Sequence, residues 1–281
     1  YFANIDDGSL EEYIEFLSSM NLRLIFALEN LNSDYFSKLA PLVKKTGGTF
    51  IRVKVGDFYG GNRFCQPDYK EMKEKFILDV QKCLPAIDKY RVKIMVENHQ
   101  DITINDLEIF IKKFGDNRIG VNWDIGNSFP TGETTSSFLK KVDQYIGNIH
   151  LKDYRFSKTN NGYMMHRCIL GDGVVDFENI ILYMMKMTNG NIPMTIELGA
   201  LIGREAMVNN PEYWLHTEGV EESDKDTLID FVNSHLESES DIISEWEKKS
   251  DPKRIADKEI DEVQISVEHI KSIINRSQSS K

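Results

Sequence analysis

Four short, mostly apolar stretches of this sequence end in side chains that can bind a metal ion. The four side chains are Glu97, Asp124, His150 and Glu197, in that order along the chain. Three carboxylates and one imidazole suit a divalent ion such as Mn²⁺, Mg²⁺, Co²⁺ or Zn²⁺. Without a cation, three carboxylates that face one another would raise each other's pKa. The pattern therefore predicts one divalent-metal site.

The alternation of apolar and polar residues indicates where these side chains point. Successive side chains of a strand lie on opposite faces of the sheet. Ile94 and Val96, for example, share one face and leave Glu97 on the other, and the other three ligand strands repeat this pattern. In a (β/α) barrel the outer face packs on helices, whereas the inner face near the C-terminal rim can be polar. We expect all four candidate ligands to point inward, with Arg52 and Lys54 of an earlier strand.

The elements that carry these residues alternate between strands and helices. The first helix is expected to open with Ser9 as its N-cap, and the first strand spans Leu22–Leu28. Further strands are expected at residues 50–55, 92–97, 121–124, 148–153 and 194–197, and helices at about 34–45, 68–90, 103–114, 134–146, 177–187 and 219–237. Such alternation predicts an α/β fold with parallel strands, as a TIM-type (β/α) barrel or a doubly wound sheet.

The chain divides into a barrel domain, residues 1–237, and a charged C-terminal helical extension, residues 238–281. Two peripheral helices are expected in the extension, separated near Pro252 and ending in a frayed, Ser-rich segment. Residues between Asp153 and Phe177, and those from Arg204 to Leu215, are expected to form loops.

Composition narrows the classes of function. A length of 281 residues suits a single α/β barrel, and a net charge of −11 argues against binding of nucleic acid. No apolar stretch approaches the roughly 20 residues that span a bilayer. Three cysteines without metal-site spacing and no basic-then-apolar leader favour a reduced, cytoplasmic location. The expected partners thus include neither nucleic acid nor a membrane, and a homo-oligomer remains open.

Each candidate residue also has a structural interpretation. A carboxylate at the end of a barrel strand is often an ion-pair partner, here for Arg52 or Lys54. A lone histidine there is more often a hydrogen-bonded core group, and Lys152 can pair with Asp153. Four matching strands in succession favour a shared site over four separate structural roles.

At these residues the sequence resembles the xylose isomerase-like superfamily of TIM-barrel sugar isomerases and epimerases. The resemblance covers about residues 92 to 199 and rests on an ordered set of pieces: Val96-Glu97-Asn98-His99, Trp123-Asp124-Ile125-Gly126-Asn127, Ile149-His150-Leu151-Lys152-Asp153, Leu170-Gly171-Asp172-Gly173, Val175-Asp176-Phe177 and Thr195-Ile196-Glu197. No single piece is specific, but their order and spacing look like the last four strands of the family's barrel.

The resemblance implies roles for these residues. Glu97, Asp124, His150 and Glu197 would hold one divalent metal ion, with Glu97 and Glu197 also serving as the acid/base pair. Asn127 stands where relatives often carry His or Asn. For substrate contacts the sequence offers His99, Lys152, Arg52 and, in the segment before Gly171, Arg167. Lys152 and Arg52 can steady an oxyanion, a phosphate or a carboxylate.

The resemblance also implies a set of functions. The first is a metal-dependent isomerase or epimerase that moves a proton next to the carbonyl of a sugar or sugar derivative. The alternative is a dehydratase of the inosose dehydratase type, which loses a β-hydroxyl instead. A role like that of endonuclease IV is poorly supported, because the chain is acidic and His166, His216, His235 and His269 lie outside the ligand strands.

The strand count differs from the family's pattern. If the quartet marks strands five to eight, two strands precede it here and the family's first two are absent. The sequence is then a truncated record, an open barrel completed by a partner, or a non-catalytic barrel that serves as a binding module. An open barrel would leave unpaired strand edges.

Overall fold

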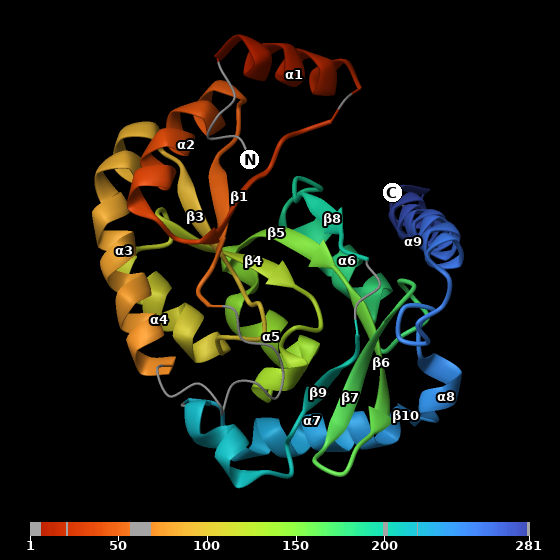
Figure 1. Cartoon of the computed structure of the whole chain (residues 1–281). Coiled ribbons are helices and arrows are strands. Elements are labelled where there is room, and N and C mark those ends of the chain that lie inside the picture. The colour runs from red at the N-terminus through yellow and green to blue at the C-terminus, as the bar shows by residue number, and fades with distance from the viewer. Residues whose placement is uncertain (1–6, 21, 57–68, 199–201, 218, 280–281) are drawn as a thin grey trace.

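The computed structural model describes residues 7–20, 22–56, 69–198, 202–217 and 219–279, and its centre is a curved sheet of six parallel strands. In spatial order these strands are β1 (Phe26–Asn30), β2 (Phe50–Lys54), β3 (Lys93–Glu97), β4 (Ile119–Asp124), β5 (Ile146–Leu151) and β8 (Met194–Ile196). A closed barrel of this type has about eight strands. The described strands therefore form a half-barrel whose edges are β1 and β8 (Figure 1).

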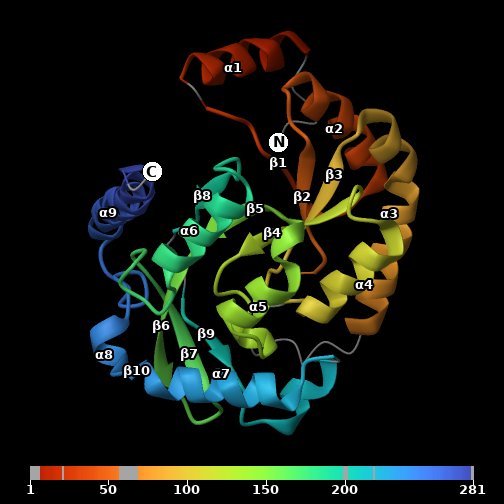
Figure 2. The ribbon, with the colours of Figure 1, turned by 180° about the vertical axis from the view of Figure 1, so that it is seen from behind.

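Helices cover the outer face of the half-barrel (Figure 2). In chain order the helices as far as residue 234 are α1 (Asp7–Ser19), α2 (Ser33–Lys45), α3 (Tyr69–Tyr90), α4 (Ile104–Phe114), α5 (Thr135–Val142), α6 (Phe177–Met187) and α7 (Glu222–Ser234), with short 3₁₀ turns η3 (Phe129–Thr131), η4 (Asp143–Tyr145) and η5 (Pro211–His216). Of these, α2 to α6 lie along the half-barrel, whereas α1 stands apart and α7 lies beside the second sheet (Figure 2). The predicted N-terminus of α4 is confirmed, because Thr103 and Asp106 form a reciprocal capping box. None of the described helices is long and apolar enough to cross a bilayer.

The strand register agrees with the predicted alternation of inner and outer residues. Glu97 aligns with Asn122, and Asp124 aligns with His150. On the outer face, Trp123 is fully buried and stacks on Phe138 of α5 with ring centroids 5.5 Å apart. The buried outer face fixes the register, since a slip of one residue would turn the polar side chains into the helices.

A second sheet, absent from the prediction, lies beside the half-barrel. It contains β10 (Leu236–Glu237), β6 (Asp153–Lys158), β7 (Tyr163–Cys168) and β9 (Arg204–Ala206), in that spatial order. The expectation of loops was therefore wrong for much of two segments. β6 and β7 pair as an antiparallel hairpin where a loop was expected after Asp153, and β9 and η5 replace the loop expected at Arg204–Leu215.

The N-terminal elements differ from the prediction in their limits. The first strand begins at Phe26 rather than Leu22, because its ladder with β2 starts at the pair Phe26 and Ile51. The first helix already includes Asp7, so Ser9 is not its N-cap.

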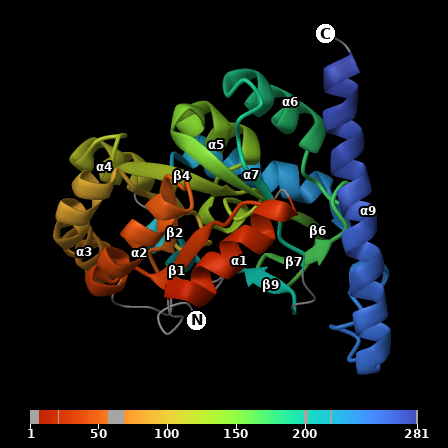
Figure 3. The ribbon, with the colours of Figure 1, turned by 90° about the horizontal axis from the view of Figure 1, so that it is seen from above.

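The C-terminal segment contains α8 (Glu239–Ile242) and a long helix, α9 (Pro252–Ser279). The predicted break near Pro252 is confirmed, whereas the helix continues through the segment expected to fray, up to Ser279. α9 runs along one side of the molecule and packs against α6 and the edge strand β8 (Figure 3). Ile270 and Ile273 are buried there. The division into domains at residue 237 stays a prediction.

Candidate metal centre

The four candidate ligands converge at the C-terminal ends of neighbouring strands. Glu97 and Asp124 end β3 and β4, His150 lies near the end of β5, and Glu197 directly follows β8. The backbone nitrogen of Glu197 donates to the carbonyl oxygen of Leu151 at 3.0 Å, which continues the ladder past the strand. One ligand atom from each of the four residues lies within 4.8 Å of the others. The convergence predicted from strand parity is therefore present.

The donor atoms fit a single divalent ion. Mg²⁺ and Zn²⁺ hold oxygen and nitrogen donors at about 2.0–2.2 Å, so donors on opposite sides of an ion are about 4 Å apart. The observed limit of 4.8 Å between the four donor atoms is close to that spacing. Asp124 is fully buried, and its Oδ1 has no hydrogen-bond partner among the described residues. A buried carboxylate oxygen without a partner is costly unless a cation binds it, so this atom supports a metal site.

Two cationic side chains contact the quartet. The Nε of Arg52 lies 2.6 Å from Oε2 of Glu97. The Nζ of Lys152 lies 2.6 Å from Oδ2 of Asp124 and 2.9 Å from Oε2 of Glu197. Lys152 is 1% exposed and pairs with these two carboxylates rather than with Asp153. The two cations hold the carboxylates in place and can also face a substrate oxygen.

A layer of buried amides and a phenol holds Asp124 in position. The side chain of Asn98 accepts from the backbone nitrogen of Asp124 at 2.7 Å and donates to its carbonyl oxygen at 3.0 Å. Asn127 donates to the Asp124 carboxylate and accepts from the Tyr154 hydroxyl at 2.9 Å and from Gln100 Nε2 at 3.0 Å. The sequence indicated Asn127 through the family resemblance, whereas Asn98, Gln100 and Tyr154 carried no role. Tyr154 could have been found from the sequence, because it lies two residues after Lys152 and so is expected on the same face.

Burial and mutual repulsion raise the pKa values of the two most enclosed carboxyls. Burial and the charge of Asp124 raise the pKa of Glu97 to about 7, against the opposing charges of Arg52 and His150. Burial also raises the pKa of Asp124, although Lys152 opposes the shift. The site therefore gains from any bound cation that keeps both groups ionised.

Glu197 lies in a different environment. Burial favours its neutral form, but the contacts with His150 and Lys152 outweigh burial and hold its pKa well below the usual range. His150 Nδ1 lies 2.9 Å from Oε1 of Glu197. Burial alone would lower the pKa of His150, yet Glu197, Asp124 and Glu97 together raise it. Glu197 is thus the carboxylate of the site that is most firmly ionised, and its side chain is 30% exposed.

His99 and Arg167 lie next to the quartet. His99 is buried, and burial together with the charges of Lys54, Lys152, Arg204 and Arg52 lowers its pKa to about 2. Arg167 lies on β7 directly opposite Tyr154. The structure thus brings all of the sequence-predicted site residues into one region, and their roles stay predictions.

The Gly171-Asp172-Gly173 turn is organised by Asp153. The Asp153 carboxylate accepts from the backbone nitrogens of Gly171, Gly173 and Val175, each at 3.0 Å, and from that of Tyr154 at 2.9 Å. The turn therefore donates these amides to Asp153 and does not offer them to a phosphate.

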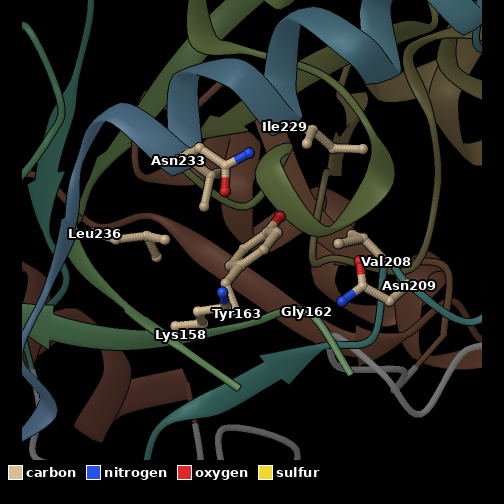
Figure 4. Close-up of a pocket in the computed structure, with 9 residues that line it drawn as sticks. Lys158, Gly162, Tyr163, Val208, Asn209, Ile229, Asn233 and Leu236 are labelled. Carbon is tan, nitrogen blue, oxygen red and sulfur yellow. The ribbon is translucent and has the colours of Figure 1, made fainter. Parts of the chain in front are cut away.

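A separate cavity of about 190 Å³ lies at the far end of the β6–β7 hairpin. Its walls come from the hairpin, the segment after β9, α7 and β10 (Figure 4). Lys158 and Tyr163 contribute to it, together with amides such as Asn233, but its lining contains no carboxylate, imidazole or thiol. This cavity therefore offers no typical metal ligand.

A half-barrel of parallel strands with ligand-type residues at its C-terminal rim defines a TIM-barrel protein with a candidate metal centre. Active sites of such barrels lie at this rim. The sequence profile of the xylose isomerase-like TIM barrel family matches residues 11–215. The chain belongs to this family.

Individual relatives are distant. The chain is 19% identical over 183 residues to the uncharacterized protein YihM of Escherichia coli K12. That match covers 65% of this chain and 54% of YihM, so the chain spans about half the length of this curated relative.

Three solved structures share the fold. A xylose isomerase-like TIM barrel protein from Mycobacterium smegmatis in complex with magnesium has a TM-score of 0.56 and 17% identity, covering 84% of this chain and 81% of that one. D-psicose 3-epimerase from Clostridium cellulolyticum, solved with D-tagatose, has a TM-score of 0.54 and 15% identity, with coverages of 83% and 86%. The probable 3-DHS dehydratase AsbF from Bacillus anthracis has a TM-score of 0.50 and 14% identity, with coverages of 81% and 81%. At these identities the likeness supports the fold alone.

Proposed function

We propose that the protein is a divalent-metal-dependent isomerase or epimerase that moves a proton next to the carbonyl of a sugar or sugar derivative. The observation that carries the proposal is the convergence of Glu97, Asp124, His150 and Glu197 within 4.8 Å at the barrel rim. An epimerase that was solved with a ketose shares this fold, which supports the substrate class. All four residues would hold the ion, which polarises a carbonyl and acidifies the neighbouring C–H bond when bound.

Glu197 is the better placed base for removing the proton. Its side chain is 30% exposed, whereas that of Glu97 is 1% exposed, so a substrate reaches Glu197 more easily. His150 and Lys152 hold the Glu197 carboxylate in position.

In this proposal Glu197 keeps the proton that it removes, and the second proton comes from Glu97, whose raised pKa of about 7 lets it carry one. Glu97 comes from β3, which is separated from β8 by β4 and β5 in the sheet, so the two glutamates approach a substrate from different sides. Delivery of the second proton to the opposite face of the same carbon gives an epimer, and delivery to the adjacent carbon gives an isomer. Lys152 and Arg52 face the oxyanion that forms, while His99, Asn127 and Arg167 orient the substrate.

A dehydratase is the second candidate. The same proton removal followed by loss of a β-hydroxyl gives elimination, and a probable dehydratase shares the fold. Incubation with ketoses and with inososes, followed by product analysis, separates the two reactions. If a protein with a bound metal ion forms neither product, the result would favour the non-catalytic barrel.

Metal binding is tested first. Elemental analysis of the purified protein, and thermal shift with Mn²⁺ before and after chelation, should show one bound ion and a rise in Tm. Asp124→Asn should lose most of that rise. A folded wild-type protein without metal and without a shift would exclude the metal centre.

The base is tested by exchange of solvent deuterium into a ketose. Glu197→Gln keeps the shape of the side chain but removes the base, so exchange should fall by about 10²-fold or more. Glu268→Gln, an exposed position on α9, is the matched control and should exchange at the wild-type rate. Equal exchange in the wild type and Glu197→Gln would rule out this role for Glu197.

A further inference from the structure

In the part of the chain that the structure describes, five cationic side chains lie near the candidate metal centre. Arg52 and Lys54 come from β2, Lys152 follows β5, Arg167 comes from β7 and Arg204 from β9. Four of them, Lys54, Lys152, Arg204 and Arg52, lie close enough to the buried His99 to act on it electrostatically. The fifth, Arg167, acts on the charge of Lys152. Cationic side chains from both sheets therefore lie near the four candidate metal ligands.

The second sheet directs two of these arginines toward the site. In the antiparallel register Arg167 is opposite Tyr154, and Arg204 is opposite Met165. Paired residues and residues two apart share one face of a sheet, so all four side chains lie on the same face. Tyr154 reaches Asn127 from this face, and Asn127 donates to Asp124. The face that carries Arg167 is therefore the one that looks onto the metal centre.

Arg167 differs from the other cations because no ion pair or hydrogen bond of its side chain is found among the described residues. Arg52 pairs with Glu97 and Glu29, Lys54 pairs with Glu29, and Lys152 pairs with two carboxylates of the quartet. The Nε of Arg167 is inaccessible to solvent and has no hydrogen-bond partner among the described residues. A desolvated N–H group without an acceptor is costly, so this Nε next to the candidate metal centre indicates a ligand.

The charge balance of the site points the same way. A divalent ion would neutralise most of the charge of the three quartet carboxylates, whereas five cationic side chains surround them. Further carboxylates near the site, among the described residues, are Glu29, which is 71% exposed, Asp101, which accepts from the backbone nitrogens of Gly56 and His99, and the buried Asp153, which accepts from backbone nitrogens. With the ion bound, the cationic side chains outnumber them, and the site attracts an anion.

We infer that the substrate carries an anionic group, a carboxylate or a phosphate, and that Arg167 binds this group beside the metal centre. The inference rests on the proposed function, because it adds a substrate class to the same site. The planar guanidinium presents two parallel N–H donors that match a carboxylate or a phosphate. Arg204, on the same face, adds to the positive potential that attracts the anion. A neutral sugar would leave Arg167 without a partner.

The binding test uses the Mn²⁺-loaded protein and isothermal titration. The probes are inorganic phosphate for one arm and glycolate for the other, with ethylene glycol as the neutral control. Arg167→Met should weaken the preferred anion by about ten- to a hundredfold, the usual range for a lost charge-assisted hydrogen-bonded pair. The probe that binds more tightly, phosphate or glycolate, indicates whether the anionic group of the substrate is a phosphate or a carboxylate.

Two further variants complete this test. Arg155→Met removes an arginine from the same sheet, but from the opposite face, where it pairs with Glu237. It changes the net charge equally and should bind the anion like the wild type. Arg167→Lys keeps the charge but loses the two parallel N–H donors of the guanidinium, so its affinity for the anion should lie between those of the wild type and Arg167→Met. An unchanged Mn²⁺ thermal shift in each variant establishes that the centre is folded.

Substrate preference is the second measurement. Deuterium exchange into a neutral ketose is compared with exchange into the same ketose carrying a phosphate or a carboxylate, and the anionic form should be preferred at least tenfold in kcat/KM. Exchange into all three at equal rates, with wild-type anion affinity in Arg167→Met, would overturn the inference and leave the proposed function standing. Anion binding that depends on Arg167, without exchange into any ketose, would support the anion site and contradict the proposed function.

Discussion

The buried His99 makes a testable contribution to the pH dependence of stability. Burial and four neighbouring cations lower its pKa in the folded protein from 6.5 to about 2. In the unfolded chain the imidazole takes up a proton below about pH 6.5. Between these two values only the unfolded state binds this proton, so the contribution of His99 to stability falls as the pH falls.

The magnitude follows from the two pKa values. Each pH unit well below 6.5 costs about 1.4 kcal/mol, and the cost at pH 5.5 relative to pH 7.5 is likewise about 1.4 kcal/mol. A bound metal ion adds positive charge nearby and would lower the pKa of His99 in the folded protein further. The direction of the pH effect on stability is therefore the same with and without metal.

The variant His99→Gln removes this linkage while keeping a neutral polar side chain. Urea unfolding of both proteins in chelator at pH 7.5, 6.5 and 5.5 gives the difference in unfolding free energy at each pH. At pH 7.5 that difference reports packing and hydrogen bonding alone. By pH 5.5 the wild type should have lost about 1.4 kcal/mol relative to the variant. A difference that stays constant over this range would show that His99 protonates in the folded protein, and the electrostatic argument for the cationic cluster would fail.

Three further predictions concern single contacts. Lys152→Met leaves Asp124 and Glu197 without their buried cation, so stability in chelator should fall by about 3–5 kcal/mol. The rise in Tm on adding Mn²⁺ should then exceed the wild-type rise, and an equal rise would contradict the role of Lys152. Thr103→Ala removes the α4 capping box and should cost about 1 kcal/mol in urea unfolding; no loss would mean that water replaces the cap. Glu247→Ala deprives His166 and the backbone nitrogens of Gly203 and Ser244 of their acceptor and should lower the free energy of unfolding by about 2–4 kcal/mol. A loss under about 1 kcal/mol would show that these contacts of Glu247 are dispensable.

The quartet could be predicted because each ligand falls on the opposite face from the apolar residues of its strand that pack on the helices. Outer positions such as Val96 and Trp123 are apolar because helices cover them, and this leaves Glu97 and Asp124 facing inward. In parallel strands the C-terminal ends meet at one rim, so parity and strand order were sufficient to bring the side chains together.

The second sheet was missed although its strands also alternate. Tyr154 and Phe156 are buried on one face of β6, and Tyr163 and Met165 on the same face of β7. The regular succession of strand and helix favoured a loop there, because each earlier strand was followed by a helix. The limits of β1 were missed for a different reason. It lies at the sheet edge, and its single partner strand, rather than its apolar residues, determines where it begins.

The partners of the cationic side chains could not be predicted from the sequence. Lys152 and Asp124 are 28 residues apart, and their contact depends on the register between β4 and β5. The position of Arg167 depends on the register of a hairpin that the sequence analysis had not identified.

The close approach of α9 to the turn after β7 links the chain's last helix to the chemistry at the rim. A Cβ added to Gly171, which has a φ of 94°, would lie 2.6 Å from Nε2 of His269 on α9. Nearby, Ser266 Oγ of the same helix accepts from the backbone nitrogen of Leu170 at 3.2 Å. Removing α9 by ending the protein before Pro252 would therefore remove the contacts that support this turn. The hydrogen bonds of the turn to Asp153, and with them the position of the neighbouring Lys152, would then be less well fixed. Expression designs that aim at an active protein should end after this helix, not before it.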